Sequence, residues 1–385
     1  VMASPRIGID VTSALTQGGG IGRYTRELVR ALLTLESHNQ YTLFSARPPD
    51  SLPVSDPLPD SPEINYRPAF LSERWLYRLW YRLRLPLPVQ LFSGPLTLFH
   101  SPDFVLPPVS GGIPTLLTVH DLSFIHFPET FPPVLVKYLN HVVPWSVSRA
   151  SHILADSIST KNDLIDHWAV PERKITVLYS GVSDAYRPVK DLAVLHSARQ
   201  TYGLQDNPYV LSVGTIQPRK NYQMLIRAFA PIARQHPFDL AIAGGKGWLE
   251  EEMKAEAARQ GIADRVRFLG FVADEHLPAL YSAASLFVFP SLYEGFGLPV
   301  LEAMACGVPA IISNSSSLPE VGGEAALQLP PQSPDAWSAG MDSVLSDRNL
   351  AAEMIEAGFL QVQQFSWQKA ARRLLGIYDA LLDKA

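Results

Sequence analysis

Short apolar runs alternate with segments of helical spacing along the chain, and this alternation constrains the fold more than any other feature. In the first half, the runs expected to form strands are Arg6–Asp10, Tyr41–Ser45, Ile64–Arg67, Leu96–His100, Thr115–Val119, Ile153–Asp156 and Ile175–Tyr179. A second series comprises Tyr209–Val213, Leu240–Ala243, Val266–Val272, Leu286–Phe289 and Ala310–Ser313. Strands that alternate with helices form parallel sheets with helices on both faces. The sequence therefore predicts an α/β protein with two doubly wound sheets.

The domain organisation follows from the length and from one cluster of turn residues. A chain of 385 residues is too long for one ordinary core, so two domains are expected. Turn-forming residues at 180–188 follow the last strand of the first series. We place the boundary there, with a first domain over residues 1–187 and a second over residues 188–365. Candidate ligand groups follow strands of both series, which predicts a cleft between the two domains.

Composition narrows the class of protein. Hydrophobic residues make up 47% of the chain and charged residues 18%, as in a globular protein. The net charge of -5 argues against nucleic acid as a partner. The single cysteine, Cys306, leaves no intramolecular disulfide and no Cys-rich metal site. No signal peptide and no uninterrupted apolar run of membrane-spanning length is visible, so we expect a cytoplasmic enzyme.

The residues after the apolar run Leu286–Phe289 predict a ligand site. Gly295 and Gly297 allow a tight turn and close approach of a ligand, and Pro299 suits the first turn of a helix. The N-terminus of that helix favours an anion. Glu294 and Glu302 flank it, and carboxylates accept hydrogen bonds from diols. A sugar nucleotide offers both groups; the alternative is a helix whose N-terminal Glu only complements the dipole.

A basic pair in the second series points to the same ligand. Arg219 and Lys220 follow the strand that ends before Gly214, and they precede a helix. Cations normally oppose the dipole at a helix start. Their presence is reasonable if a diphosphate lies between them and the helix N-terminus. The alternative is a solvated basic pair.

Two features of the first series are candidate ligand groups. The glycine loop Gly18–Gly22 joins a strand to a helix, and it could hold a phosphate or be only a flexible turn. His120 follows an apolar strand, at the sheet edge where ligands bind. It could bond a sugar hydroxyl, move a proton, or be a capping or core histidine. The spacing of His100, His120 and His126 does not predict a metal site.

The segment Ser72–Leu85 predicts a basic amphipathic helix. Arg74, Arg78 and Arg82 recur every four residues and would line one face, while Trp75 and other apolar residues would line another. Such a helix can lie on an anionic membrane surface. It can equally pack its aromatic residues on the sheet.

Several motifs in order resemble the family 4 retaining glycosyltransferases. The motifs are the run from Gly214 to Asn221, the run from Gly270 to Tyr281, and Glu294 to Pro309, in which Glu294 and Glu302 form the Glu-x7-Glu signature. The glycine loop, His120-Asp121 and Phe365-Ser-Trp367 also fit. The resemblance covers essentially the whole chain. It implies a GT-B fold, with two Rossmann-like domains facing a central cleft and a final helix, 366–385, that packs back onto the first, acceptor-binding domain.

The resemblance also implies roles for individual residues. Arg219 and Lys220 would hold the donor diphosphate, Glu302 the ribose hydroxyls, and Glu294 the transferred sugar. The expected catalytic set is Glu294, His120, Arg219 and Lys220. The expected donor-binding set is Arg219, Lys220, Glu294, Gly295, Phe296, Gly297, Leu298, Glu302, Gly214, Thr215, Phe271, Val272, Gly19 and Gly20. Thr215 departs from the family, because many members carry Arg at this position.

The expected reaction is transfer of a hexose from a nucleotide sugar to a glycan or a lipid-linked saccharide. Gly-Thr followed by Pro-Arg-Lys-Asn resembles bacterial polysaccharide mannosyltransferases, which suggests GDP-mannose, with UDP-glucose or UDP-N-acetylglucosamine as alternatives. The sequence has no Asp-x-Asp, so we expect no metal and no cofactor. No good nucleophile is evident, which favours front-face attack. A nucleotide-sugar hydrolase, an epimerase and a non-catalytic binding protein are further alternatives.

Overall fold

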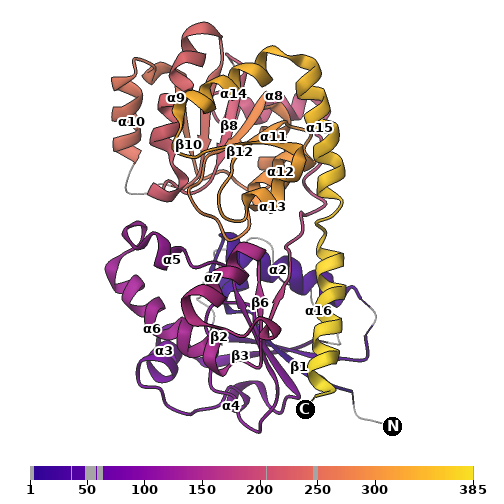
Figure 1. Ribbon diagram of the computed structural model, residues 1–385. Helices are drawn as coiled ribbons and strands as arrows, with labels where there is room; N and C mark the ends of the chain where they lie inside the picture. Colours follow the sequence, from indigo (N-terminus) through magenta and orange to yellow (C-terminus); the bar gives the residue numbers. More distant parts are fainter. Residues whose placement is uncertain are drawn as a thin grey trace. The chain divides into compact units, whose positions relative to one another are not determined.

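A computed structural model describes residues 4–35, 37–47, 58, 64–204, 206–245 and 250–384 (Figure 1). The chain divides into two compact units, Val1–Gly181 with Trp367–Ala385, and Val182–Ser366. We call them unit 1 and unit 2. The division falls six residues before the expected boundary after residue 187. Residues just after it belong to unit 2 because Val182 pairs with Ser366 and the Tyr186 ring packs on Tyr281.

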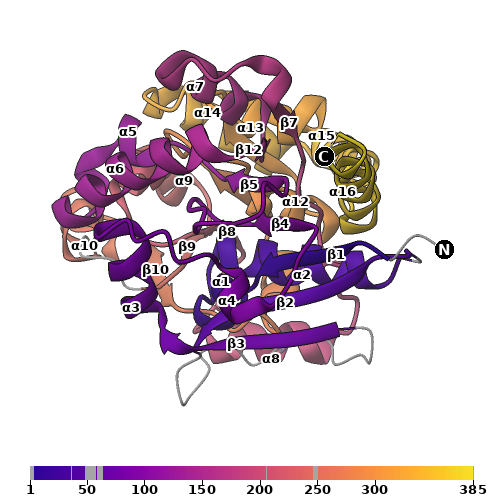
Figure 2. The same cartoon turned by 90° about the horizontal axis from the view of Figure 1, so that it is seen from below.

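Unit 1 contains a sheet of seven parallel strands in the order β3-β2-β1-β4-β5-β6-β7. The strands are β1 (Arg6–Asp10), β2 (Gln40–Arg47), β3 (Ile64–Ser72), β4 (Leu98–Ser101), β5 (Thr115–Val119), β6 (His152–Ala155) and β7 (Ile175–Val177). Figure 2 shows β3, β2 and β1 side by side. Strands β2 and β3 lie on one side of β1, and strands β4 to β7 follow one another on its other side. The order therefore reverses between β1 and β4.

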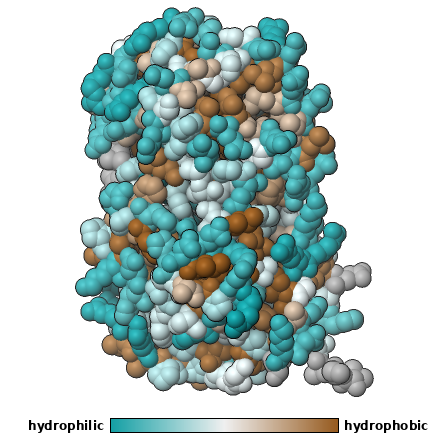
Figure 3. All heavy atoms as spheres, viewed as in Figure 1, coloured by the Kyte–Doolittle hydropathy of each residue, from teal (hydrophilic) through white to brown (hydrophobic). Residues whose placement is uncertain are grey.

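The helices of unit 1 complete its two outer layers. They are α1 (Thr12–Thr16), α2 (Gly20–Leu33), α3 (Glu73–Tyr77), α4 (Gln90–Ser93), α5 (Ser123–His126), α6 (Pro133–Arg149), α7 (Ile158–Trp168) and α16 (Trp367–Leu382). The last helix joins this unit through Trp367, whose ring lies 5.7 Å from Tyr24, and Tyr378, whose hydroxyl lies 2.8 Å from His100 Nδ1. On the face seen in Figure 3, hydrophobic side chains gather in places over α6 and α7.

Unit 2 contains six parallel strands in the order β10-β9-β8-β11-β12-β13. The strands are β8 (Tyr209–Val213), β9 (Asp239–Ala243), β10 (Val266–Gly270), β11 (Leu286–Phe289), β12 (Ala310–Ser313) and β13 (Ala326–Leu329). The helices are α8 (Leu192–Thr201), α9 (Tyr222–Gln235), α10 (Glu250–Arg259), α11 (Leu277–Ala283), α12 (Leu298–Ala305), α13 (Leu318–Gly322), α14 (Pro334–Ser346) and α15 (Arg348–Val362). Here the order reverses between β8 and β11. The two predicted doubly wound sheets are confirmed, and β13 is an additional edge strand.

The prediction of one regular amphipathic helix over Ser72–Leu85 is wrong. Strand β3 extends to Ser72, α3 covers only five residues, and the next five, Arg78–Arg82, form a π-helical turn. The wider turn breaks the four-residue spacing on which a single arginine face depended. Trp80 is buried, whereas Trp75 is half exposed with the Arg78 guanidinium 4.9 Å from its ring centre.

No helix in the described ranges is both long enough and apolar enough to cross a membrane.

Candidate active site

The first part of the site follows strand β8. The backbone passes Gly214 and forms a 3-10 turn, Pro218–Lys220, before α9 begins. Asn221 joins the two in the left-handed conformation, with φ 61°, and its amide donates to the carbonyls of Pro290 and Pro331. Gly214 lies tightly against Lys220, because an added Cβ would lie 3.2 Å from Lys220 Cε and the lysine would have to shift. The turn therefore fixes the basic pair at the carboxyl end of β8.

The second part follows strand β11. The Ser316 hydroxyl accepts a hydrogen bond from the Glu294 N–H at 2.8 Å. The Ser317 hydroxyl donates to the carbonyls of Glu294 and Phe296, at 2.9 and 2.7 Å. Gly297 has φ 118°, and a Cβ there would lie 2.8 Å from Leu318 Cδ2. Two serines and a required glycine thus hold the loop against the start of α13.

These two loops come together because β8 and β11 are neighbours in the sheet. They are also the strands between which the strand order reverses, and connections leave such a pair on opposite faces of the sheet. A crevice for ligands forms at the carboxyl ends of strands at this point. Both predicted groups therefore lie at the expected ligand position of unit 2.

Glu294 bridges the basic pair. Its Oε1 lies 2.5 Å from Lys220 Nζ, and its Oε2 lies 2.9 Å from Arg219 Nη1. The three side chains are at most 15% exposed. Burial alone would raise the pKa of Glu294, but the charges of Arg219 and Lys220 outweigh it and lower the pKa to about 2. The cluster carries a net positive charge, which suits a diphosphate.

Helix α12 brings Glu302 under the same loop. Glu302 is 3% exposed, and its Oε2 accepts a hydrogen bond from the Tyr281 hydroxyl at 2.9 Å. Gly295, Phe296 and Gly297 are buried in the loop, and Leu298 opens the helix. Thr215 is exposed beside Gly214. Phe271 and Val272 follow β10, with the Phe271 ring 75% exposed and Val272 buried.

His120 lies in unit 1, directly after strand β5. Its Nδ1 is 2.8 Å from Asp156 Oδ2, and its Nε2 is 3.2 Å from the Pro102 carbonyl. Desolvation would lower the pKa of His120, but the Asp156 charge and hydrogen bond raise it to about 9. The imidazolium is therefore held by acceptors on both nitrogens, an arrangement that favours a fixed cation over a proton carrier.

The glycine loop of unit 1 precedes α2. Gly19 is the N-cap and Gly20 is the first helical residue; both are exposed, and a Cβ added at either would meet nothing within 4 Å. Arg26 braces the preceding loop by donating to the carbonyls of Ala14 and Gln17. Helix α2 thus begins within the glycine run, and the short helix α1 stands between β1 and this loop, where the sequence predicted a direct connection from the strand.

Sequence reasoning did not single out the residues that hold these groups in place. Asp156, Tyr281, Ser316 and Ser317 each fix a predicted site residue. Asp156 was detectable in principle, because it follows the strand next to β5 and so ends at the same sheet edge as His120. The two serines carry no signal of their own, because serine is common in turns.

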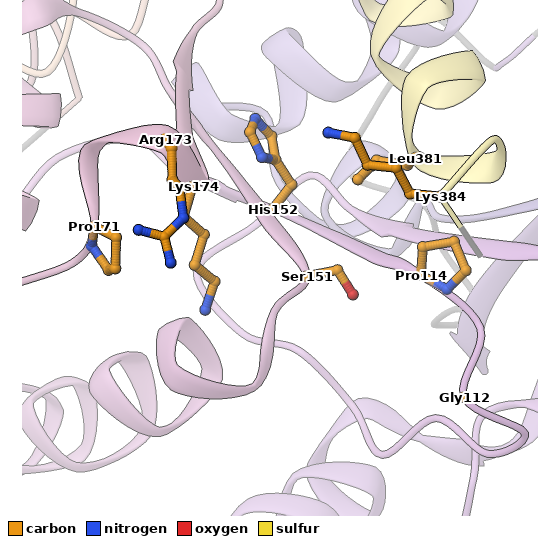
Figure 4. A pocket seen from close by; sticks show the side chains of 9 residues that line it. All are labelled: Gly112, Pro114, Ser151, His152, Pro171, Arg173, Lys174, Leu381 and Lys384. Atoms are coloured by element: carbon orange, nitrogen blue, oxygen red, sulfur yellow. The ribbon is translucent and has the colours of Figure 1, made fainter.

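A cationic hollow of about 450 Å³ lies elsewhere in unit 1. Figure 4 shows Arg173 and Lys174 on one side of it and Lys384 on the other. Lys174 Nζ donates to the Val147 and Ser148 carbonyls near the end of α6. The hollow lies at the amino ends of β5 to β7, the edge opposite to that of the ligand crevice.

Family models agree with this architecture. The model described as "Glycosyltransferase Family 4" matches residues 18–186, and that described as "Glycosyl transferases group 1" matches residues 197–361. The O-antigen chain mannosyltransferase B of Escherichia coli is 35% identical over 375 residues, which cover 94% of this chain and 96% of the relative.

Solved structures share the fold. The sucrose-phosphate synthase of Thermosynechococcus elongatus superposes with a TM-score of 0.75 and 22% identity, over 99% of this chain and 100% of that one. Anabaena HepE, solved in complex with UDP and glucose, gives a TM-score of 0.71 and 18% identity over 98% and 100%. The fold and the matches define a glycosyltransferase of the GT-B type. The chain belongs to the family 4 glycosyltransferases.

Proposed function

We propose that this enzyme transfers a hexose, with retention of configuration, from a nucleotide sugar to a saccharide acceptor. The observation that carries the proposal is the buried cluster of Arg219, Lys220 and Glu294 at the switch point of unit 2. Two cations around one carboxylate leave a positive charge for the donor diphosphate. The carboxylate can accept hydrogen bonds from hydroxyls of the transferred sugar.

Bond cleavage explains the need for two cations. The bond between the anomeric carbon and the β-phosphate oxygen breaks, so negative charge grows on the leaving nucleoside diphosphate. Arg219 and Lys220 stabilise this charge, and the α12 N-terminus, which begins at Leu298, adds its dipole. A preorganised donor of this kind contributes roughly 3 kcal/mol to transition-state stabilisation. The pair can thus take the part that a divalent metal plays elsewhere, and we propose metal-independent transfer.

Retention fits a front-face reaction. The acceptor hydroxyl attacks the anomeric carbon from the side of the leaving group, and its proton passes to the departing phosphate oxygen. Glu294 is a poor candidate for a covalent nucleophile because Arg219 and Lys220 hold both of its oxygens. Trapping of a covalent sugar–protein adduct would overturn this part of the proposal.

The remaining donor contacts extend the same proposal. Glu302, positioned by Tyr281, would accept hydrogen bonds from the ribose, and Phe271 and Val272 would contact the base. Gly19 and Gly20 would lie by the phosphates and the acceptor. His120 would act near the sugar as a fixed positive charge.

We propose GDP-mannose as the donor. Support comes from the mannosyltransferase named among the relatives and from the segment Gly214–Asn221. UDP-glucose is the alternative, since a relative in fold was solved with UDP and glucose. Calorimetric titration with GDP, UDP and ADP, with and without EDTA, separates the two. We expect a preference for GDP that survives EDTA; a preference for UDP would reject mannose, and a loss of binding in EDTA would reject metal independence.

We further propose that the saccharide acceptor is linked to a lipid. Trp75 and Leu83 are 52% and 61% exposed, on a segment that also carries Arg74, Arg78 and Arg82. Exposed aromatic and basic side chains together favour an anionic lipid surface at the inner face of the plasma membrane.

Vesicle sedimentation tests this contact. The variant Arg74→Gln/Arg78→Gln/Arg82→Gln should bind anionic vesicles several-fold less than wild type, with nucleotide affinity unchanged. The matched control is Arg372→Gln/Arg373→Gln, which neutralises two exposed arginines of α16. An equal loss per neutralised charge in both variants would show that only total charge matters.

A further inference from the structure

Unit 1 contains a cavity of about 90 Å³ that the donor site does not use. Its lining residues combine carboxylates, hydroxyls and aromatic rings; they include Asp10, Glu73, Asp103, Tyr77, Tyr81, Tyr138 and Trp80. Asp10 ends β1, and Asp103 lies two residues beyond β4. The sheet order reverses between these two strands. The cavity therefore lies at the switch point of unit 1, where a doubly wound sheet binds its ligands.

The three carboxylates have no ion-pair partner in the described part of the chain. Among the described residues, Asp10, Glu73 and Asp103 form no ion pair. Asp10 Oδ1 accepts hydrogen bonds from the Thr12 N–H and hydroxyl, at 2.9 and 2.6 Å, and Asp103 Oδ1 accepts from the Phe104 N–H at 2.6 Å. Each aspartate thus has one oxygen fixed by the backbone, and no described residue donates to the other.

Electrostatics make this arrangement costly without a ligand. Burial raises the pKa of Asp10 to about 6, and the charges of Asp103 and Glu73 add to the effect. Burial also raises the pKa of Asp103, although the nearby His120 charge offsets part of the effect, and it raises the pKa of Glu73, which remains exposed on one side. Groups that oppose folding in this way are typical of functional sites. The pattern needs a ligand that donates hydrogen bonds to carboxylates.

An unpartnered tyrosine supports a ligand independently of the acids. Tyr81 lines the cavity and is 7% exposed, and its hydroxyl makes no hydrogen bond within the described part of the chain. Buried hydroxyls are normally hydrogen-bonded. The rings of Tyr77 and Tyr138, whose centres are 4.6 Å apart, form an aromatic wall of the same cavity.

Together these groups match the chemistry of a pyranose ring. Its C–H face is apolar and packs against aromatic rings, while its hydroxyls donate to carboxylates and exchange hydrogen bonds with tyrosine. A phosphate or carboxylate on the same sugar would meet three acidic groups, of which only Asp103 has a nearby positive charge, that of His120, and would be repelled. The cavity is larger than one water site but small for a whole hexose, so part of one ring would enter it.

We propose that this cavity binds a neutral, hydroxyl-rich sugar residue of the acceptor, with Asp10, Glu73 and Asp103 as hydrogen-bond acceptors and Tyr77 and Tyr138 as the stacking wall. The proposal rests on the proposed glycosyl transfer and specifies its acceptor. The sugar that enters is uncharged, even where the acceptor carries a lipid diphosphate elsewhere.

Saturation-transfer NMR on the full chain in EDTA tests the proposal. The probes are methyl α-mannopyranoside, methyl α-glucopyranoside and mannose 6-phosphate. We expect at least one neutral glycoside to give a signal that falls several-fold in Asp103→Asn and in Tyr138→Ala, while mannose 6-phosphate gives none. Glu73→Gln, in the first turn of α3, tests the same point if Asp103→Asn does not fold. The matched control is Asp166→Asn, an exposed carboxylate on α7.

Several outcomes would overturn the proposal. They are no signal from either neutral glycoside with wild type, undiminished signals in both Asp103→Asn and Glu73→Gln, or stronger binding of mannose 6-phosphate. A further outcome is that Ca²⁺ or Mn²⁺, added to a sample without EDTA, abolishes the glycoside signal of the wild type but has no such effect in Asp103→Asn. That outcome would identify a metal site instead. Nucleotide titration of Lys220→Ala keeps the two proposals separate: unchanged nucleotide affinity there rejects the donor site, whatever the glycosides do.

Discussion

The two units have the same kind of sheet but opposite charge where the strand order reverses. In unit 2, the loops after β8 and β11 bring Arg219 and Lys220 around Glu294. In unit 1, the end of β1 and the segment after β4 bring Asp10 and Asp103 to one cavity, and neither forms an ion pair with a described residue. The fold provides the crevice in both units. The residues that line it decide its charge, and our two proposals assign a diphosphate to the positive crevice and a neutral sugar to the acidic one.

The pKa values express the same contrast. Burial raises the pKa of a carboxylate unless cations compensate. Arg219 and Lys220 lower the pKa of Glu294 to about 2, whereas Asp10 has only acidic neighbours and its pKa is raised to about 6. Glu294 is therefore ionised at any pH at which the enzyme works. Of these two carboxylates, Asp10 is therefore the one whose ionisation changes closer to neutral pH.

The largest predicted effect comes from removing a cation from unit 2. Lys220→Ala should lower kcat/KM for the donor about 100-fold, because a preorganised donor at the leaving group is worth roughly 3 kcal/mol. Release of nucleoside diphosphate from the nucleotide sugar measures the effect. Lys254→Ala is the control, since Lys254 is exposed on α10 and pairs only with Glu250 and Glu251 there. A loss of kcat/KM below threefold would refute the role of Lys220. It would also remove the functional meaning of the charge difference between the two units.

The next effect tests the loop that holds Glu294. Gly297→Ala should destabilise the protein by about 2 kcal/mol, because φ is 118° and the new Cβ would lie 2.8 Å from Leu318 Cδ2. Denaturant unfolding measures the loss. The control is Gly376→Ala in α16, where nothing lies near the added Cβ and a gain of about 0.5–1 kcal/mol is expected. Equal effects of the two substitutions would mean that the Gly297 conformation is not required.

A smaller effect of opposite sign is expected in unit 1. Asp10→Asn should raise the free energy of unfolding at pH 7 by about 1 kcal/mol, because it removes a partly buried charge that no cation compensates. The pKa of Asp10 is about 6 in the folded protein and near 3.8 when unfolded, so the ionised form opposes folding at high pH. The gain should be complete above pH 6 and should vanish as the pH falls below 3.8. Urea unfolding of both proteins at about pH 7 and about pH 3.5 checks it, and a gain that persists at the lower pH would contradict the charge argument.

Much of the unit 2 site could be predicted because its residues lie next to their strands. Glu294 follows β11 by five residues and Lys220 follows β8 by seven, so the turn and the strand were both visible in the sequence. Their direct contact was not, because it depends on β8 and β11 being neighbours in the sheet.

The acidic cavity of unit 1 could not be predicted in the same way. Glu73 and Tyr138 reach it from α3 and α6, and their packing depends on long-range contacts of the whole layer. The π-helical turn after α3 was also hidden, since a four-residue arginine spacing is compatible with a regular helix. Local patterns therefore indicated the strands and turns, but not which distant segments share a pocket.

The smallest predicted effect would sharpen the charge contrast. Thr215→Arg should strengthen nucleoside diphosphate binding about 1.4- to fivefold, because an exposed ion pair contributes about 0.2–1 kcal/mol. Thr215 is exposed beside Gly214, so the new side chain has room to reach a phosphate. Calorimetric titration at two salt concentrations measures the gain, which should shrink as salt rises. Thr215→Gln is the uncharged control; if it binds nucleotide as tightly as Thr215→Arg, the added charge contributes nothing, and Arg219 and Lys220 already saturate the diphosphate.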